Sequence, residues 1–115
     1  MEDHPEIARQ YHSGYADLAE VIPKTTSAFG RLVMDATDNG ALSVKTKELI
    51  AFAIAIAARC EGCLSHHAQA VFKAGATRQE VAEVIGVAML MGGGPSTVYG
   101  VEALRAFDGF AGSAR

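Results

Sequence analysis

The sequence predicts an all-α fold, a compact bundle of five to six helices, and three observations support this prediction. Alanine is abundant, and half of all residues are hydrophobic. Runs that alternate apolar and polar residues, as in half-buried strands, are absent. Glycine and proline fall at spacings that separate helices. With only 115 residues, the chain is expected to form a single domain over residues 1–115, built from helices packed on helices.

Local signals place the helices in order along the chain. Proline stands in the first turn of three of them (Pro5, Pro23 and Pro95), where its missing N–H costs no hydrogen bond. Ser43 is a good N-cap, and Thr77 opens a capping box. The expected helices cover residues 5–20, 23–39, 44–58, 78–91 and 95–107. A further helix is expected between the third and the fourth of these, from a turn at residues 60–62 to a stop at residue 75.

Two of these helices are apolar around nearly their whole circumference. The third contains an unbroken apolar run from Leu49 to Ala58, and the fifth is almost as uniform. Such helices must be buried on every side, yet a small domain has little interior in which to bury them. We therefore predict a homo-oligomer with an apolar interface; the alternative is a compact monomer whose N-terminal helices cover both. Met89 and Met91 are assigned to the core or to that interface.

Charge and composition exclude several classes of partner. The net charge of −3 gives no electrostatic footprint for nucleic acid or for an anionic membrane. The longest apolar run has ten residues, whereas a membrane-spanning helix needs about 20. The polar, acidic start Met1-Glu2-Asp3 is unlike a secretory leader. We expect a cytoplasmic protein with no nucleic-acid or membrane partner.

The most informative stretch is Cys60-Glu61-Gly62-Cys63 with His67 beyond it. These are the only two cysteines, and their spacing allows one short segment to open and close a disulfide. In the cytosol such a pair is more typical of redox chemistry than of a structural staple. On a helix, His67 lies one turn beyond Cys63 on the same face. A helix start at this point favours the thiolate, and the imidazole adds a base.

This arrangement predicts thiol-based peroxide reduction. A peroxide would oxidise Cys63 to the sulfenic acid, Cys60 would condense with it, and an external dithiol would restore the pair. The same residues leave other interpretations open: a general thiol–disulfide oxidoreductase, a non-enzymatic redox-sensing oligomer, a zinc site with His67 as third ligand, or two small buried apolar side chains. Covalent haem attachment is excluded because Leu64 follows Cys63 where that motif needs histidine.

Three further features are interpreted from their positions alone. Glu48, placed in the first turn of the third helix, is read as a solvated carboxylate that favours the helix N-terminus. His66 is read as a solvent-facing or interface residue. The glycine run 92–94 is read as a helix stop, because a phosphate-binding loop would need a preceding strand and a following lysine.

The spacing of the motif resembles the alkylhydroperoxidase D-like branch of the carboxymuconolactone decarboxylase family. Glu48, Cys60, Cys63 and His67 carry the resemblance, which extends over about residues 30–105 and includes the segments 47–51, 63–68 and 73–77. It implies an all-α fold, a trimer or hexamer, and peroxide reduction without metal or flavin, so that no cofactor is expected.

The resemblance also implies a role for each residue of the motif. Cys63 would attack a hydroperoxide substrate, Cys60 would resolve the product, and Glu48 would join His67 in a proton relay. The reductant would be an external dithiol of the thioredoxin or lipoyl type. Gly62 stands where the best-studied pattern has histidine, so one arm of the relay is missing or replaced by water or by Glu61. The decarboxylase side of the family lacks the cysteine pair, so the pair favours redox over lactone chemistry.

Overall fold

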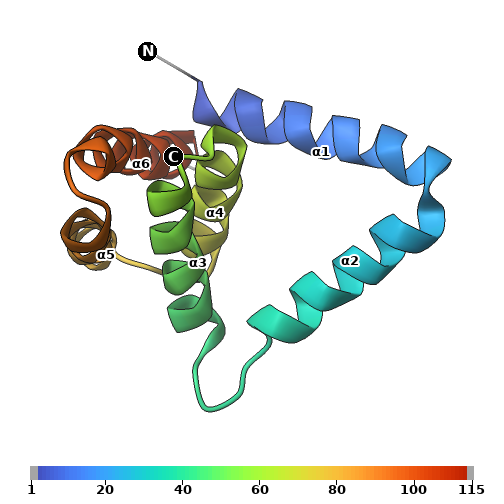
Figure 1. Ribbon diagram of the computed structural model, residues 1–115, viewed down its shortest axis with the longest axis horizontal. Helices are drawn as coiled ribbons and strands as arrows, with labels where there is room; N and C mark the ends of the chain where they lie inside the picture. The colour runs from blue at the N-terminus through green and yellow to red at the C-terminus, as the bar shows by residue number, and fades with distance from the viewer. Residues whose placement is uncertain (1–2, 114–115) are drawn as a thin grey trace.

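The structure, a computed structural model, describes residues 3–113, and these form six helices and no strand (Figure 1). The all-α prediction is confirmed. The last helix runs well past the predicted end at residue 107, and the other boundaries lie within a few residues of those predicted. The helices are α1 (His4–Val21), α2 (Pro23–Thr37), α3 (Val44–Ala58), α4 (Glu61–Lys73), α5 (Arg78–Gly92) and α6 (Gly94–Ser113).

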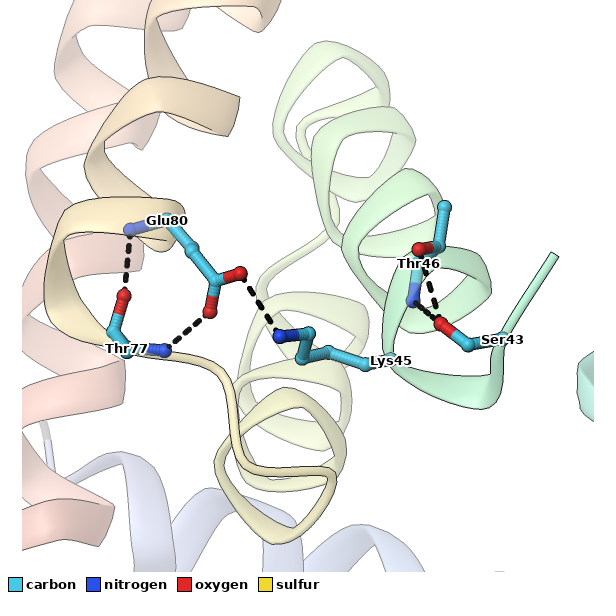
Figure 2. A network of polar contacts seen from close by, with 5 residues as sticks. All are labelled: Ser43, Lys45, Thr46, Thr77 and Glu80. Atoms are coloured by element: carbon cyan, nitrogen blue, oxygen red, sulfur yellow. Dashed lines mark hydrogen bonds and ion pairs between the residues drawn. The ribbon is translucent and has the colours of Figure 1, made fainter.

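The predicted caps fix the starts of α3 and α5 and link the two helices (Figure 2). The Ser43 hydroxyl accepts a hydrogen bond from the Thr46 N–H at 3.1 Å. Thr77 and Glu80 cap each other, with the Thr77 N–H 2.8 Å from the Glu80 carboxylate and the Glu80 N–H 3.1 Å from the Thr77 hydroxyl. The Lys45 ammonium lies 2.9 Å from that carboxylate. One side chain therefore caps α5 and joins it to the first turn of α3.

Helices α3 to α6 pack into a core. Its largest fully buried apolar side chains are Phe52, Ile56, Leu64, Val71 and Val81. The glycine run ends α5 and begins α6, as predicted. A Cβ on Gly92 would lie 1.9 Å from the Ser96 hydroxyl, so only glycine fits this corner.

A buried polar cluster attaches the start of α1 to the core. His4 is 2% exposed, and its Nδ1 lies 2.8 Å from the hydroxyl of Ser65 on α4. Its Nε2 lies 3.0 Å from a carboxylate oxygen of Glu102 on α6. Because Ser65 is fully buried, His4 satisfies a hydroxyl that would otherwise be left without a partner. This contact fixes where α1 crosses α4 and α6.

Helices α1 and α2 form an arm that extends away from the core, and α2 returns toward the start of α3 (Figure 1). The Tyr15 hydroxyl donates to the Thr26 carbonyl at 2.9 Å and holds the two helices together. Phe29 and Met34 on α2 are 51% and 71% exposed. The apolar face of α2 is thus only partly covered by its own chain.

The single chain does not bury α3 and α5 on every side, so its N-terminal helices do not cover both, as the monomer alternative requires. Ile54 on α3 is 62% exposed, and Leu90 on α5 is 80% exposed. Met89 and Met91 lie on the surface of the single chain and not in its core, which leaves an interface as their predicted place. Each helix packs one face against the core and leaves the opposite apolar face uncovered. Within residues 3–113, every helix is too short or too polar to span a bilayer.

Candidate active site

The cysteine pair lies at the turn from α3 into α4. Arg59 adopts a left-handed conformation with φ of 58° that ends α3, and Cys60 is the N-cap of α4. Cys63 follows in the first turn, and the two residues are joined by a disulfide with their Cα atoms 5.2 Å apart. The Cys63 N–H also donates to the Cys60 sulfur at 3.3 Å. Both sulfurs therefore lie at the positive end of the α4 dipole, where negative charge is favoured.

Glu48 and His67 meet across the interface of α3 and α4. Glu48 Oε1 lies 3.6 Å from His67 Nδ1, and the two side chains are 10% and 23% exposed. The contact is too long for a hydrogen bond and is an ion pair when the imidazole is protonated. The interpretation of Glu48 as a solvated carboxylate in the first turn is wrong, because the residue is buried in the second turn. A buried carboxylate of this kind requires a cation or a hydrogen-bond donor nearby.

His66 lies inside the site, not on an open surface. Its ring centroid is 4.9 Å from that of His67 and 5.2 Å from that of His12 on α1, and Tyr11 approaches at 6.1 Å. Burial lowers the pKa of His66 below its usual 6.5, and the neighbouring His67 and His12 lower this pKa further. No local sequence pattern predicts this row of rings, because only the fold brings α1 over α4.

A cavity of about 590 Å³ separates the arm from the start of α4. A volume of this size is within the usual range for a small organic ligand. Both cysteines and both α4 histidines open onto it. The arm contributes Tyr11, His12, Tyr15, Phe29, Gly30, Val33 and Met34, and α4 contributes Cys60, Gly62, Cys63, His66 and His67.

The zinc alternative needs a cluster of ligands around the cysteine pair. Across residues 3–113, the His, Cys, Asp and Glu side chains form no group of three or more that could hold a metal ion. The sulfurs of Cys60 and Cys63 bond to each other. The arrangement can support acid–base and thiol chemistry: two sulfurs at a helix start, a buried carboxylate beside one imidazole, and a second imidazole in the cavity wall.

Comparisons with known proteins identify a family model and several proteins that are similar to this chain. The model of the carboxymuconolactone decarboxylase family matches residues 23–106. An uncharacterized protein of Cupriavidus necator is 38% identical over 103 residues, which cover 90% of this chain and 88% of that protein. An uncharacterized protein of Haemophilus influenzae is 36% identical over 67 residues, or 58% of this chain and 59% of that one.

A solved structure extends the similarity to three dimensions. It is the crystal structure of the apo form of a carboxymuconolactone decarboxylase family protein from Legionella pneumophila, which superposes with a TM-score of 0.92. The two sequences are 42% identical, and the match covers 96% of this chain and 98% of that one. Sequence and fold together show that the chain belongs to the carboxymuconolactone decarboxylase family.

Proposed function

We propose that this protein is a thiol-dependent peroxidase that reduces hydroperoxides with Cys60 and Cys63. The main support is the disulfide between these residues at the start of α4, in the wall of a cavity and beside the Glu48–His67 pair. Family membership alone is compatible with lactone chemistry, and it is the cysteine pair that favours redox chemistry. No metal or flavin takes part in the proposed reaction.

Cys63 is proposed as the attacking residue because it is the more exposed cysteine and lies one turn from His67. The start of α4 stabilises its thiolate, and His67 accepts the thiol proton while Glu48 balances the resulting charge. The sulfur attacks one peroxide oxygen, so that an S–O bond forms and the O–O bond breaks. The departing alkoxide takes a proton from His67 and leaves as the alcohol, while Cys63 becomes the sulfenic acid.

Cys60 completes the two-electron oxidation. Its sulfur attacks the sulfur of Cys63, so that the S–S bond forms and the S–O bond breaks, and hydroxide leaves as water. The disulfide product is the state that the structure contains. An external dithiol, of the thioredoxin or lipoyl type, then returns two electrons and two protons through a mixed disulfide.

Stepwise oxidation of the reduced protein tests the proposal. Addition of a hydroperoxide should remove both thiols and two hydrogens, as followed by intact mass. Cys63→Ser should abolish peroxide consumption, whereas Cys60→Ser should stop at a sulfenic acid that dimedone traps. His67→Ala should slow the reaction by about 10²-fold or more, the usual contribution of a positioned acid–base group.

Two outcomes would reject the peroxidase assignment. Wild-type turnover by Cys63→Ser would show that this sulfur is not the reacting atom. Rapid reaction with small disulfides, without reaction with any hydroperoxide, would instead assign a general thiol–disulfide oxidoreductase.

We also propose that the chain works as a homo-oligomer, because apolar side chains on three core helices lack cover within the chain. Ile54, Leu90, Met91 and Val98 are each more than 60% exposed, and large apolar patches of this kind mark interaction sites. Light scattering should give a multiple of the 12.0 kDa chain mass, such as a trimer or hexamer, and Leu90→Lys should reduce it. A single-chain mass for the unmodified protein at micromolar concentration would contradict this proposal.

A further inference from the structure

Two neighbouring histidines of α4 line the same cavity as the cysteine pair, and they contact different helices. His67, four residues after Cys63, is in contact with Glu48 of α3. His66, three residues after Cys63, lies instead against His12 of α1. Positions three and four residues apart are both neighbours on a helix surface, so Cys63 has two imidazoles within one turn. In the peroxide reaction proposed above, His67 has a role and His66 has none.

Gly62 leaves the first turn of α4 open where this turn lines the cavity. Gly62 is four residues before His66, and a Cβ placed on Gly62 would meet no atom within 4 Å. Helical side chains lean toward the helix N-terminus and cover the preceding turn. The His66 side chain therefore leans toward the turn that contains Cys63, and it lines the same cavity as both cysteines.

The Nδ1 atom of His66 is buried, and no hydrogen-bond partner faces it among the residues that the structure describes. Burying a polar atom without a partner costs stability, so such atoms usually have a functional reason. In contrast, the buried His4 uses both of its ring nitrogens for contacts with Ser65 and Glu102. The histidine that holds the fold together is fully paired, whereas His66 and its neighbour His67 each line the cavity with a buried Nδ1 that makes no hydrogen bond to a described residue.

The chemistry of the cysteine pair requires two proton transfers. The Cys63 proton moves through His67 to the departing alkoxide in the first step. In the second step the Cys60 thiol must lose its proton as it attacks, and the group leaving Cys63 must gain one. The Glu48–His67 pair lies on the α3 side of α4, whereas His66 and His12 are the imidazoles of the described lining on the α1 side of the cavity.

We propose that His66 is the acid–base residue of the disulfide-forming step: it takes the proton from the Cys60 thiol and returns it to the group that leaves Cys63. In the peroxide reaction this group is hydroxide, which departs as water while the S–S bond forms and the S–O bond breaks. The assignment rests on the proposed function and adds a residue to it. It also gives the half-buried His66 a different role from the neighbouring His67.

The surroundings keep His66 in the form that the step needs. Burial is the main cause that lowers its pKa below 6.5, and the charges of His67, His12 and Lys73 lower it further, while Glu48 has a smaller opposing effect. His66 is therefore neutral at pH 7 and can accept a proton. As the pH falls through this lowered pKa, the ring becomes protonated and the disulfide-forming step should slow.

Separate measurement of the two steps tests the role of His66. The substitution His66→Asn removes the titrating group and keeps a polar side chain. We expect disulfide closure to slow by about tenfold or more, within the range for a general base, and the acid limb of its pH profile to disappear. In a Cys60→Ser background, the same substitution should change sulfenic acid formation by less than about threefold. Tyr99→Phe is the control, because Tyr99 packs against the core outside the cavity lining and the change removes only a hydroxyl; both steps should remain as in the wild type.

Disulfide closure by His66→Asn at the wild-type rate, with an unchanged pH profile, would overturn the assignment. An equal slowing of sulfenic acid formation and disulfide closure would also overturn it, because it would indicate a general disturbance of the cavity. Oxidised glutathione separates this result from a failure of the proposed function. Reaction with Cys63 forms a mixed disulfide with one glutathione and releases the other. The Cys60 sulfur then attacks the Cys63 sulfur and releases the second glutathione as its thiol, which requires the same proton transfer. If peroxide does not react but His66→Asn still slows this displacement, the peroxidase assignment is wrong and the role of His66 stands.

Discussion

The core of α3 to α6 and the arm of α1 and α2 are built from similar helices but differ in what covers them. Phe52 in α3 is fully buried, whereas Phe29 in α2 is 51% exposed. Each helix has a local start signal, the Ser43 cap for α3 and Pro23 for α2. The difference shows that local signals decide where a helix forms, while burial depends on whether other elements of the chain reach its apolar face.

The candidate site lies where these two regions meet. The core supplies the cysteines and the Glu48–His67 pair, on helices held by packed side chains. The arm supplies aromatic and aliphatic side chains on the opposite wall of the cavity. The reacting atoms are thus held by the tightly packed part of the molecule, and the shape of the space around them depends on the less covered part.

Matched phenylalanine substitutions would test this contrast most strongly. Phe52→Ala should lower the free energy of unfolding by about 3–5 kcal/mol, because it removes a ring from a packed core and leaves a cavity. Phe29→Ala should cost at least about 2 kcal/mol less, because surface substitutions have small effects, and any loss should depend on protein concentration if partner chains cover the arm. Urea unfolding measures both.

Equal losses for the two variants at every concentration would break the distinction between core and arm. If Phe52→Ala does not fold, Phe52→Leu provides the same comparison. Its loss should be smaller but should still exceed that of Phe29→Leu.

The attachment of the arm provides a smaller test. His4→Ala would leave the buried Ser65 hydroxyl without its partner, which should cost about 1–3 kcal/mol. The effect should be local, because His4 joins only the start of α1 to the core. Hydrogen exchange should therefore accelerate in the first turns of α1 and change little in α3. His12→Ala, on the same helix, is the control and should change stability by less than about 0.5 kcal/mol.

Faster exchange throughout α3 to α6 in His4→Ala would show that the arm and the core unfold as one unit. Unchanged exchange in α1 would show that the contacts of His4 do not hold the arm in place.

The sequence predicted most helix boundaries because local chemistry determines them. Ser43 and Thr77 accept hydrogen bonds from the N–H groups of the first turns they cap. Pro23 begins α2, and the glycine run separates α5 from α6. Each of these signals acts within about four residues, so the printed sequence contains the whole interaction.

The geometry of the site was only partly predictable, because its contacts join distant segments. The spacing of Cys60, Cys63 and His67 could be read from one helix. The burial of Glu48 and its approach to His67 depend on how α3 packs on α4, which no local pattern specifies. The position of His66 depends on His12, which is 54 residues earlier in the chain and is brought close by the path of α1.

The family match begins at Pro23, so α1 lies outside the matched segment even though it contributes Tyr11, His12 and Tyr15 to the cavity. In the proposed reaction, the dithiol that carries the electrons and the α1 side chains that line the cavity therefore lie on separate segments of the chain. Exchanging residues 4–21 between relatives, with His4 and His12 retained, is expected to alter substrate preference through Tyr11 and Tyr15 and to leave the proposed chemistry unchanged. In such chimaeras, new selectivity would come from a single replaceable segment at the N-terminal end.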